Sequence, residues 1–582
     1  MSSPRTDPPT LEAERFLESA ERELLDRSIE TQQAEWVYAT YITPETEALA
    51  ARANARLIAA TVAIAKRAVP LATPDLPGPL ARRLRLLRLV LPLVAPSDAD
   101  EAKELTRIVA ALQGAYGRAR YRPAGRPDPL PLEELEQILK ISRDPAQLAD
   151  VWTGWHAIGA PMRRDFARYV ELGNRGAREV GFPDMGAMWR SKYDMAPDAF
   201  AREVDRLWEQ VRPFYLSLHT YVRRRLREEY GESVVPRRGP IPAHLLGNMW
   251  AQDWVALLPR LAPAGSAPAF DLTALLGQRT TDPVEVVRYA ERFFSSLGFD
   301  PLPASFWERS MFARPADRDV VCHASAWDLD FVDDLRIKMC IDIDAEDFRV
   351  IHHELGHCYY QRAYNHQPFV FRDSAHDGFH EAIGDAIALS VTPEYLVRIG
   401  LLDRAPGPEG DLGLLLERAL EKVAFLPFGL LIDQWRWKVF AEEIRPEEFN
   451  RSWWEMRRRY QGVAPPAPRG EEAFDPGAKY HIPANVPYMR YFLAHILQFQ
   501  FHRGLVRGAG GDGPLHRRSI YGERAAGERL RQMLSMGMSR PWPEALRALT
   551  GEDRMDAGAL LEYFAPLRAW LDEQNDGEEL GW

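Results

Sequence analysis

The stretch His353-Glu354-Leu355-Gly356-His357 constrains this chain more than any other part of its sequence. Histidines four positions apart share one face of an α-helix, where both imidazoles can reach a single metal ion. Glu354 lies beside them and is placed to take a proton from a water molecule at that metal. The stretch therefore predicts a helix that carries two zinc ligands and a general base, an arrangement that serves the hydrolysis of peptide bonds.

A second helical stretch, residues 378–385, supplies a candidate for a third ligand. Glu381 follows His357 at a spacing that suits a ligand from an adjacent helix. Asp385, one helical turn later, is placed to accept the free ring N–H of a zinc histidine and so to fix its tautomer. The alternative for Asp385 is a solvated carboxylate at the helix end. Three protein ligands leave the fourth zinc position open for water.

Composition restricts the class of protein. The 582 residues are 46% hydrophobic and 27% charged, and no Ser/Gly-rich linker or block of like charge divides them. We therefore expect one large folded unit, residues 1–582, built of two lobes. The net charge of -11 argues against a nucleic-acid or anionic-membrane partner, because neither surface attracts an acidic protein.

Signals for export or for membrane insertion are weak. The first residues lack the apolar core of a secretion signal. The longest apolar runs, residues 57–65 and 423–432, are shorter than the ~18 residues of a membrane span, so no span is predicted. We expect a cytoplasmic protein if Met1 is the native start. A secreted or periplasmic location, with a signal already removed, is the alternative.

Helical periodicity dominates the chain. Apolar residues recur at three and four spacing over residues 11–67, and long helices are also predicted for residues 144–171 and 198–230. The convincing short strands are residues 319–323 and 335–342, which we expect to pair just before the metal helix. Such a pair either forms the edge of a substrate groove or only supports the metal helix. The predicted fold class is all-α, with one short strand pair near the site.

The chain resembles the peptidyl-dipeptidase A, or angiotensin-converting enzyme, family of zinc peptidases over essentially its whole length. The segments that carry the resemblance are residues 322–328, 352–357, 378–385, 433–437, 474–479, 481–483, 486–491, 498–502 and 539–545. The family fold that this resemblance implies is a two-lobed helical ellipsoid with a deep central groove and zinc at its floor. It also implies lid helices at about 10–67, a zinc-binding core at about 319–391 and a C-terminal lobe at about 412–582.

The resemblance implies a zinc enzyme that releases C-terminal dipeptides from oligopeptides. Its zinc ligands correspond here to His353, His357 and Glu381, and its catalytic residues to Glu354, His481 and Tyr491. In this assignment Tyr491 and His481 stabilise the oxyanion that forms at the scissile carbonyl. Without the resemblance, Tyr491 would be a core aromatic residue and His481 an ordinary loop histidine.

Dipeptide release requires a fixed positive charge that binds the terminal carboxylate of the substrate, two residues beyond the broken bond. The resemblance assigns this anchor to Lys479, with Gln252 and Tyr488 beside it. His323 and Ala324 match the family's edge that binds the substrate backbone. We therefore expect short peptides with a free C-terminus as substrates.

The same family is activated by chloride, and the resemblance supplies candidate anion ligands. They are Arg190, Tyr221, Trp453 and Arg457 for one site, and Arg490 with Tyr221 for the other. A guanidinium buried without a carboxylate is costly, so a bound anion is a reasonable partner. Ordinary pairing of arginine with aspartate is the alternative in a chain with 84 acidic residues.

The cysteines depart from the family pattern. Cys322 and Cys340 match one of its disulfides, whereas residues 504–521 contain no cysteine for the C-terminal one. This departure favours a minimal, microbial-type member. Cys358 has no matching partner and is expected to be a buried thiol.

Two other functions remain open. A branch of the same family has arginine in place of the glutamine of Trp-Ala-Gln and removes single residues, and Gln252 therefore favours dipeptide release. A non-catalytic binding protein with the same fold is the second alternative. The intact zinc ligands and Glu354 count against it.

Overall fold

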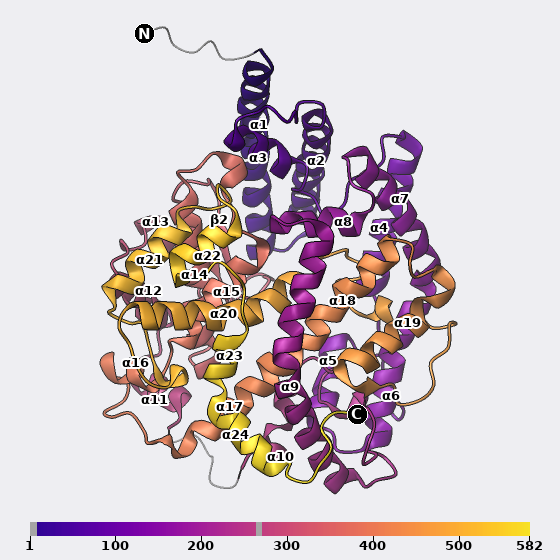
Figure 1. Ribbon diagram of the computed structural model, residues 1–582, viewed down its shortest axis with the longest axis vertical. Helices are drawn as coiled ribbons and strands as arrows, with labels where there is room; N and C mark the ends of the chain where they lie inside the picture. The colour runs from indigo at the N-terminus through magenta and orange to yellow at the C-terminus, as the bar shows by residue number, and fades with distance from the viewer. Residues whose placement is uncertain (1–7, 264–269) are drawn as a thin grey trace.

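The computed structural model describes residues 8–263 and 270–582 and is almost wholly helical, which confirms the predicted fold class (Figure 1). The helices of the first half are α1 (Pro8–Thr40), α2 (Pro44–Ala68), α3 (Gly78–Leu87), α4 (Ala99–Gly117), α5 (Leu132–Ile141), α6 (Pro145–His156), α7 (Arg163–Glu179), α8 (Met185–Arg190), α9 (Pro197–Tyr230), α10 (Leu258–Leu261), α11 (Leu272–Arg279) and α12 (Pro283–Leu297). Those of the second half are α13 (Ala304–Arg309), α14 (Ala345–Tyr364), α15 (Asp377–Leu389), α16 (Pro393–Arg398), α17 (Asp411–Arg418), α18 (Ala424–Phe440), α19 (Phe449–Met456), α20 (Met489–Gly508), α21 (Arg524–Leu534), α22 (Trp542–Thr550), α23 (Gly558–Tyr563) and α24 (Ala565–Gln574).

α1 and α2 form a helical hairpin that projects from one end of the molecule (Figure 1). Thr43 caps α2, because its side chain accepts from the backbone N–H of Thr46 while the Thr46 hydroxyl accepts from the N–H of Thr43. Pro44 follows at the first helical position, where no N–H is needed. The hairpin is held by a small hydrophobic cluster of its own, built from α1, α2 and α3 and including Leu17, Leu24, Ile64, Leu84 and Leu87.

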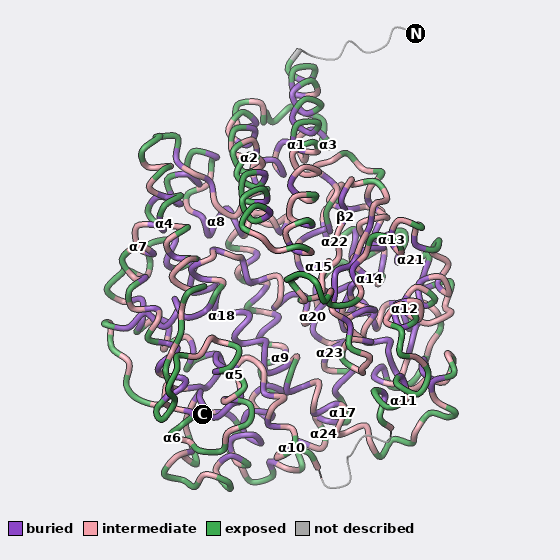
Figure 2. Tube along the Cα trace, turned by 180° about the vertical axis from the view of Figure 1, so that it is seen from behind, coloured by how far each residue is buried: buried purple, intermediate pink, exposed green. Residues whose placement is uncertain are grey.

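α2 also bears on the membrane prediction. Among the described residues it is the one helix with the length and apolar composition of a membrane span. Only 28% of its most apolar stretch is buried, and Figure 2 shows many exposed residues along α2. Length and composition are all that this observation rests on, and a single such helix is weak evidence for a span.

The helices that carry the site lie in the middle of the fold. α14 packs on α15, α15 packs on α20, and α20 packs on α18. Figure 2 shows buried residues concentrated along α18 and α20, in agreement with the nearly continuous burial of both helices. A helix that is buried on most sides must be surrounded by other elements, so these two helices run through the main hydrophobic core.

The long helix predicted for residues 144–171 is wrong. Two helices, α6 and α7, occupy this region and are joined by a 3₁₀ turn, Ala157–Met162, that contains Pro161. A side chain at Gly159 would clash with the backbone carbonyl of Phe474, so the turn packs closely on a distant loop. This long-range contact, together with Pro161, interrupts the helical pattern.

A strand pair is present before α14 as predicted, but the position predicted for its first strand is wrong. β2 (Ser325–Asp328) pairs in an antiparallel manner with β3 (Leu335–Lys338), so the first strand begins after residues 319–323. The N–H of Val321 instead donates to Ala39 O at 2.8 Å, at the end of α1. A second sheet, which the sequence did not indicate, pairs β1 (Ile241–Pro242) with β4 (Val463–Ala464) in parallel.

The Cys322–Cys340 disulfide is present, and Cys358 is a buried free cysteine, as predicted. The disulfide ties the segment before β2 to the end of β3. Lys338 reinforces the same segment, because its buried Nζ donates to Val321 O at 2.7 Å and to His323 O at 2.6 Å. Both ties hold the edge that contains His323 next to the metal helix α14.

Candidate active site

Two glycines bring the metal helix α14 and its neighbour α15 unusually close together. A Cβ on Gly356 would lie 3.0 Å from the Cα of Gly384, and a Cβ on Gly384 would lie 2.6 Å from Nδ1 of His353. The two helices begin at the N-cap residues Asp344 and His376, whose side chains accept from Asp347 N and Gly378 N. Close approach of the two backbones is what lets a short glutamate side chain of α15 reach the histidines of α14.

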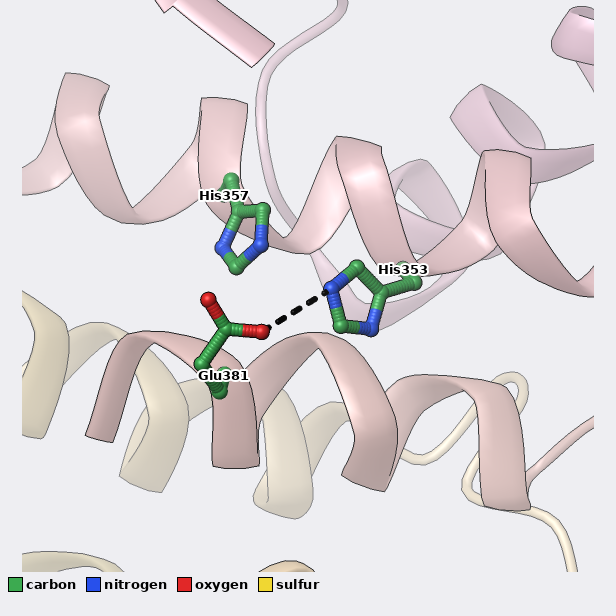
Figure 3. A group of neighbouring side chains, drawn as sticks. All are labelled: His353, His357 and Glu381. Carbon is green, nitrogen blue, oxygen red and sulfur yellow. Dashed lines mark ion pairs between the residues drawn. The ribbon is translucent and has the colours of Figure 1, made fainter. Parts of the chain in front are cut away.

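His353, His357 and Glu381 converge between these helices (Figure 3). Their potential ligand atoms all lie within 4.8 Å of one another, and His353 Nε2 is 3.8 Å from a carboxylate oxygen of Glu381. Burial alone lowers the pKa of His353, but Asp385 and the nearby glutamates outweigh it and raise that pKa to about 9. The surroundings therefore favour a positive charge here, and two imidazoles with one carboxylate are a donor set that fits zinc.

Asp385 meets His353 as predicted. His353 Nδ1 lies 3.2 Å from Asp385 Oδ1, which leaves Nε2 of the ring free for a metal. The other carboxylate oxygen accepts from Gln498 Nε2 at 3.0 Å and lies 3.4 Å from Lys422 Nζ. Burial opposes ionisation, but Lys422 and His353 hold the pKa of Asp385 well below its usual range. The sequence reasoning did not identify Lys422, which no local pattern links to the metal helix.

Glu354 lies beside the metal ligands in the wall of a cavity of about 740 Å³. Only 7% of the residue is exposed, and burial raises the pKa of its carboxyl group. His323 and Ala324 line the same cavity, so the predicted base and the predicted substrate edge face one space. His323 is exposed and Ala324 is half-buried, so this edge is open to solvent.

His481 and Tyr491 approach each other, with ring centroids 5.8 Å apart. Asp433 organises this region, because its carboxylate accepts from the backbone N–H groups of Tyr488 and Met489 at the start of α20. Arg436 forms a buried ion pair with Asp433 and donates to His481 O at 2.8 Å. Burial lowers the pKa of His481, which keeps the ring neutral at physiological pH.

Lys479, Gln252 and Tyr488 also come together. Lys479 is 5% exposed, and its Nζ lies 3.8 Å from the ring centroid of Trp250 and 5.6 Å from that of Tyr488. Burial lowers the pKa of this ammonium group to about 7. Tyr488 Oη donates to Gln252 Oε1 at 3.1 Å. Gln252 follows Ala251, a non-glycine residue with φ of 53°, so the turn that presents it is locally strained.

Part of the predicted chloride group is assembled. Arg457 is fully buried without an ion pair in the described part of the chain, and only its Nη2 donates, to Trp250 O at 2.9 Å. Its Nε and Nη1 have no hydrogen-bond partner, and neither does Nε1 of Trp453, whose ring centroid is 5.9 Å away. Burial lowers the pKa of Arg457 to about 9. A buried cation with two unsatisfied donor atoms is a place where an anion would be stabilised.

The rest of the predicted chloride grouping is not supported. Arg490 has a carboxylate nearby, with its Nε 3.4 Å from Asp377 Oδ2. Tyr221 lies elsewhere, donating to Leu261 O at 2.6 Å and packing against Trp570. Arg190 lies over the ring of Trp437. The second anion site, Arg490 with Tyr221, stays a prediction.

A helical fold in which a His-Glu-x-x-His helix faces a glutamate on the next helix has the architecture of a zinc metallopeptidase. The chain matches the family described as angiotensin-converting enzyme over residues 8–582, and it belongs to that family. This result confirms the resemblance noted in the sequence.

Similarity to known relatives extends along the chain. Angiotensin-converting enzyme of Bos taurus is 41% identical over 582 residues, which cover 98% of this chain and 44% of that protein. The enzyme of the same name from Theromyzon tessulatum is 45% identical over 460 residues, or 78% of this chain and 74% of that protein. The chain thus spans less than half the length of its bovine relative.

Proposed function

We propose that this chain is a zinc-dependent peptidyl-dipeptidase that releases dipeptides from the free C-terminus of short peptides. The observation that carries the proposal is the position of Tyr488. Its ring lies 4.6 Å from His481, 4.9 Å from Tyr491 and 5.6 Å from Nζ of Lys479. One side chain therefore contacts both the proposed oxyanion donors and the proposed carboxylate anchor.

His353, His357 and Glu381 would hold zinc, which when bound supplies a Lewis acid and lowers the pKa of water. Glu354 takes the proton from the attacking water and returns it to the leaving amine, and its raised pKa suits both transfers. Tyr491 donates to the oxygen of the scissile carbonyl as negative charge develops there, with His481 beside it. Groups held in place before substrate binds need little reorganisation at the moment of reaction.

The carboxylate anchor determines how many residues leave. Lys479 is desolvated among aromatic rings, and a substrate carboxylate would supply a paired negative charge for its ammonium group. Gln252 accepts from Tyr488 through its amide oxygen, which leaves its NH₂ group free to donate to the same carboxylate. This arrangement favours dipeptide release over the single-residue carboxypeptidase, in which an arginine would take the place of Gln252.

Mass spectrometry of the products from a free-acid decapeptide tests the proposal. We expect successive loss of two-residue units and little reaction with the C-terminally amidated peptide, because the amide removes the charge that Lys479 pairs with. Single-residue ladders would favour the carboxypeptidase. Cuts within the amidated peptide would contradict the Lys479 anchor, and absence of any cleavage by the zinc-loaded chain would favour a binding protein.

We further propose that chloride activates the enzyme through Arg457. Support comes from the burial of this guanidinium, its two donor atoms without partners and the nearby indole N–H of Trp453. Arg457 also donates to the carbonyl of Trp250, whose ring packs on Lys479. An anion at Arg457 would therefore act on the carboxylate anchor through Trp250.

A further inference from the structure

The two candidate zinc histidines differ in what their second ring nitrogen contacts. Nδ1 of His353 faces the carboxylate of Asp385, which can only accept a hydrogen bond when ionised. Nδ1 of His357 lies 3.0 Å from Nδ1 of another histidine, His380, and the Nε2 of His380 lies 3.2 Å from Tyr364 Oη. The proposed reaction makes no use of His380 or Tyr364.

The positions of the ring protons on His357 and His380 determine which role His380 can have. Only one proton can lie between the two facing Nδ1 atoms. If His380 donates it, His357 must carry its own proton on Nε2, the nitrogen that would otherwise bind metal. If His380 accepts it, Nε2 of His357 is free, and His380 carries its proton on Nε2 and donates to Tyr364. The second order is the one compatible with a metal ligand.

We propose that His380, with Tyr364 behind it, is a positioning residue that accepts the Nδ1 proton of His357 and so fixes the metal-binding tautomer of that ligand. The inference rests on the zinc site of the proposed function and deepens it. Glu381 directly follows His380, so successive residues of α15 supply one metal ligand and the support for another. Adjacent helical positions differ by about 100° in direction, which lets the two side chains reach different partners.

The surroundings hold His380 in place. Its ring packs against that of Tyr360, with centroids 4.6 Å apart, and Tyr360 and Tyr364 are both buried. Tyr360 is in turn fixed by the backbone N–H of Ala375, which donates to its hydroxyl. A ring confined in this way can switch tautomer but has little room to leave His357.

The test measures zinc affinity by competition with a chelator and needs no peptide. Asparagine places an amide oxygen close to where Nδ1 of histidine lies, whereas leucine has the same shape without an acceptor. We expect the dissociation constant for zinc to rise about 10- to 100-fold in His380→Leu and to stay within about threefold of the parent in His380→Asn. The visible spectrum of the cobalt-substituted protein should change in His380→Leu and be largely restored in His380→Asn.

Each outcome decides a question. Parent-like zinc affinity in His380→Leu overturns the proposal, and so does equal weakening in both variants, because packing rather than an acceptor would then matter. Thermal unfolding of the metal-free proteins checks the fold, and His380→Ala replaces His380→Leu if that variant does not fold. Absence of zinc binding by the parent overturns both the proposed function and the role inferred for His380. Zinc binding with the expected variant pattern but no peptide cleavage overturns the peptidase activity alone.

Discussion

Glu354 depends on its carboxylate for chemistry but not for the shape of the site. It lies in the cavity wall next to His353 and is no part of the set of three metal ligands. Glu354→Gln keeps the size and polarity of the side chain and removes its ability to take a proton. We expect zinc content equal to that of the parent and peptide cleavage lower by about 10²- to 10⁴-fold, measured by metal analysis and by a cleavage assay on the same preparation.

His353→Gln serves as the matched control for this variant, because it removes a ligand and should lower the zinc content itself. Equal zinc content in the parent and Glu354→Gln, with activity within about tenfold, would remove Glu354 from its assigned role.

The ammonium group of Lys479 loses its proton near neutral pH because it is buried. Its pKa is lowered to about 7, with the carboxylate of Glu136 acting in the opposite direction. Below pH 7 the group is charged and binds a substrate carboxylate, and above pH 7 the free enzyme loses that charge. We therefore expect KM for a free-acid peptide to rise between pH 7 and 9, by up to about tenfold per pH unit, in steady-state measurements.

Lys479→Arg separates this effect from other titrating groups, because a guanidinium remains charged across the same range. Its KM should change much less with pH, whatever its absolute value. A parent KM that stays constant from pH 6 to 9 would show that Lys479 does not carry the binding charge.

Among the secondary-structure elements, the segment before β2 is held by two separate ties. The Cys322–Cys340 disulfide closes a loop of 18 positions, and Lys338 binds the carbonyls on either side of Cys322. Replacing both disulfide cysteines with serine should lower the free energy of unfolding by about 3 kcal/mol, measured in denaturant. The folded double variant should retain its peptide cleavage, because Lys338 still positions His323.

A reductant supplies the internal comparison. It should lower the denaturation midpoint of the parent to that of the double variant and leave the double variant unchanged. Cys358→Ser, which alters a buried thiol outside the disulfide, should keep the sensitivity of the parent to reductant. A parent that does not respond to reductant would show that this tie contributes nothing to stability.

Local periodicity explains which parts of these elements the sequence could predict. The spacing of His353 and His357 determines a shared helix face without knowledge of the fold, and the spacing of Glu381 and Asp385 places both carboxylates on one face of the next helix in the same way. The prediction of a strand at residues 319–323 was wrong because the backbone N–H of Val321 donates to the carbonyl of Ala39, far away in the chain. An apolar run indicates an extended segment but not its partner.

Contacts between distant segments were out of reach for the same reason. Asp377 pairs with Arg490, and Lys422 stands behind Asp385, but neither pair shares a helix or a strand. The contact between His357 and His380 depends on how closely α14 and α15 approach, which Gly356 and Gly384 allow. Burial of Lys479 among aromatic rings likewise requires segments from distant parts of the chain to be in place. Side-chain roles that depend on such packing came from the family resemblance and not from periodicity.

In the whole molecule, Arg457 connects the interior of the fold to the substrate anchor. It donates to the carbonyl of Trp250, and Gln461 on the same helical segment donates to the carbonyl of Ala251 at 3.0 Å. These two carbonyls precede Gln252 directly. The short segment of residues 250–252 therefore links the buried charge of Arg457 to the groups that are proposed to bind the substrate carboxylate.

Chloride at Arg457 and substrate at Lys479 should consequently bind cooperatively. Because linkage is reciprocal, chloride should lower KM for a free-acid peptide, by about 5- to 150-fold if the coupling is of ordinary size. The measurement is a chloride titration against acetate at fixed ionic strength, which keeps general screening constant.

Arg457→Met should abolish the response. Arg490→Lys should retain the same fold activation even if its basal activity changes, because Arg490 already has Asp377 as its partner. A flat response in the parent would remove the anion site, and loss of activation in Arg490→Lys alone would move that site from Arg457 to Arg490.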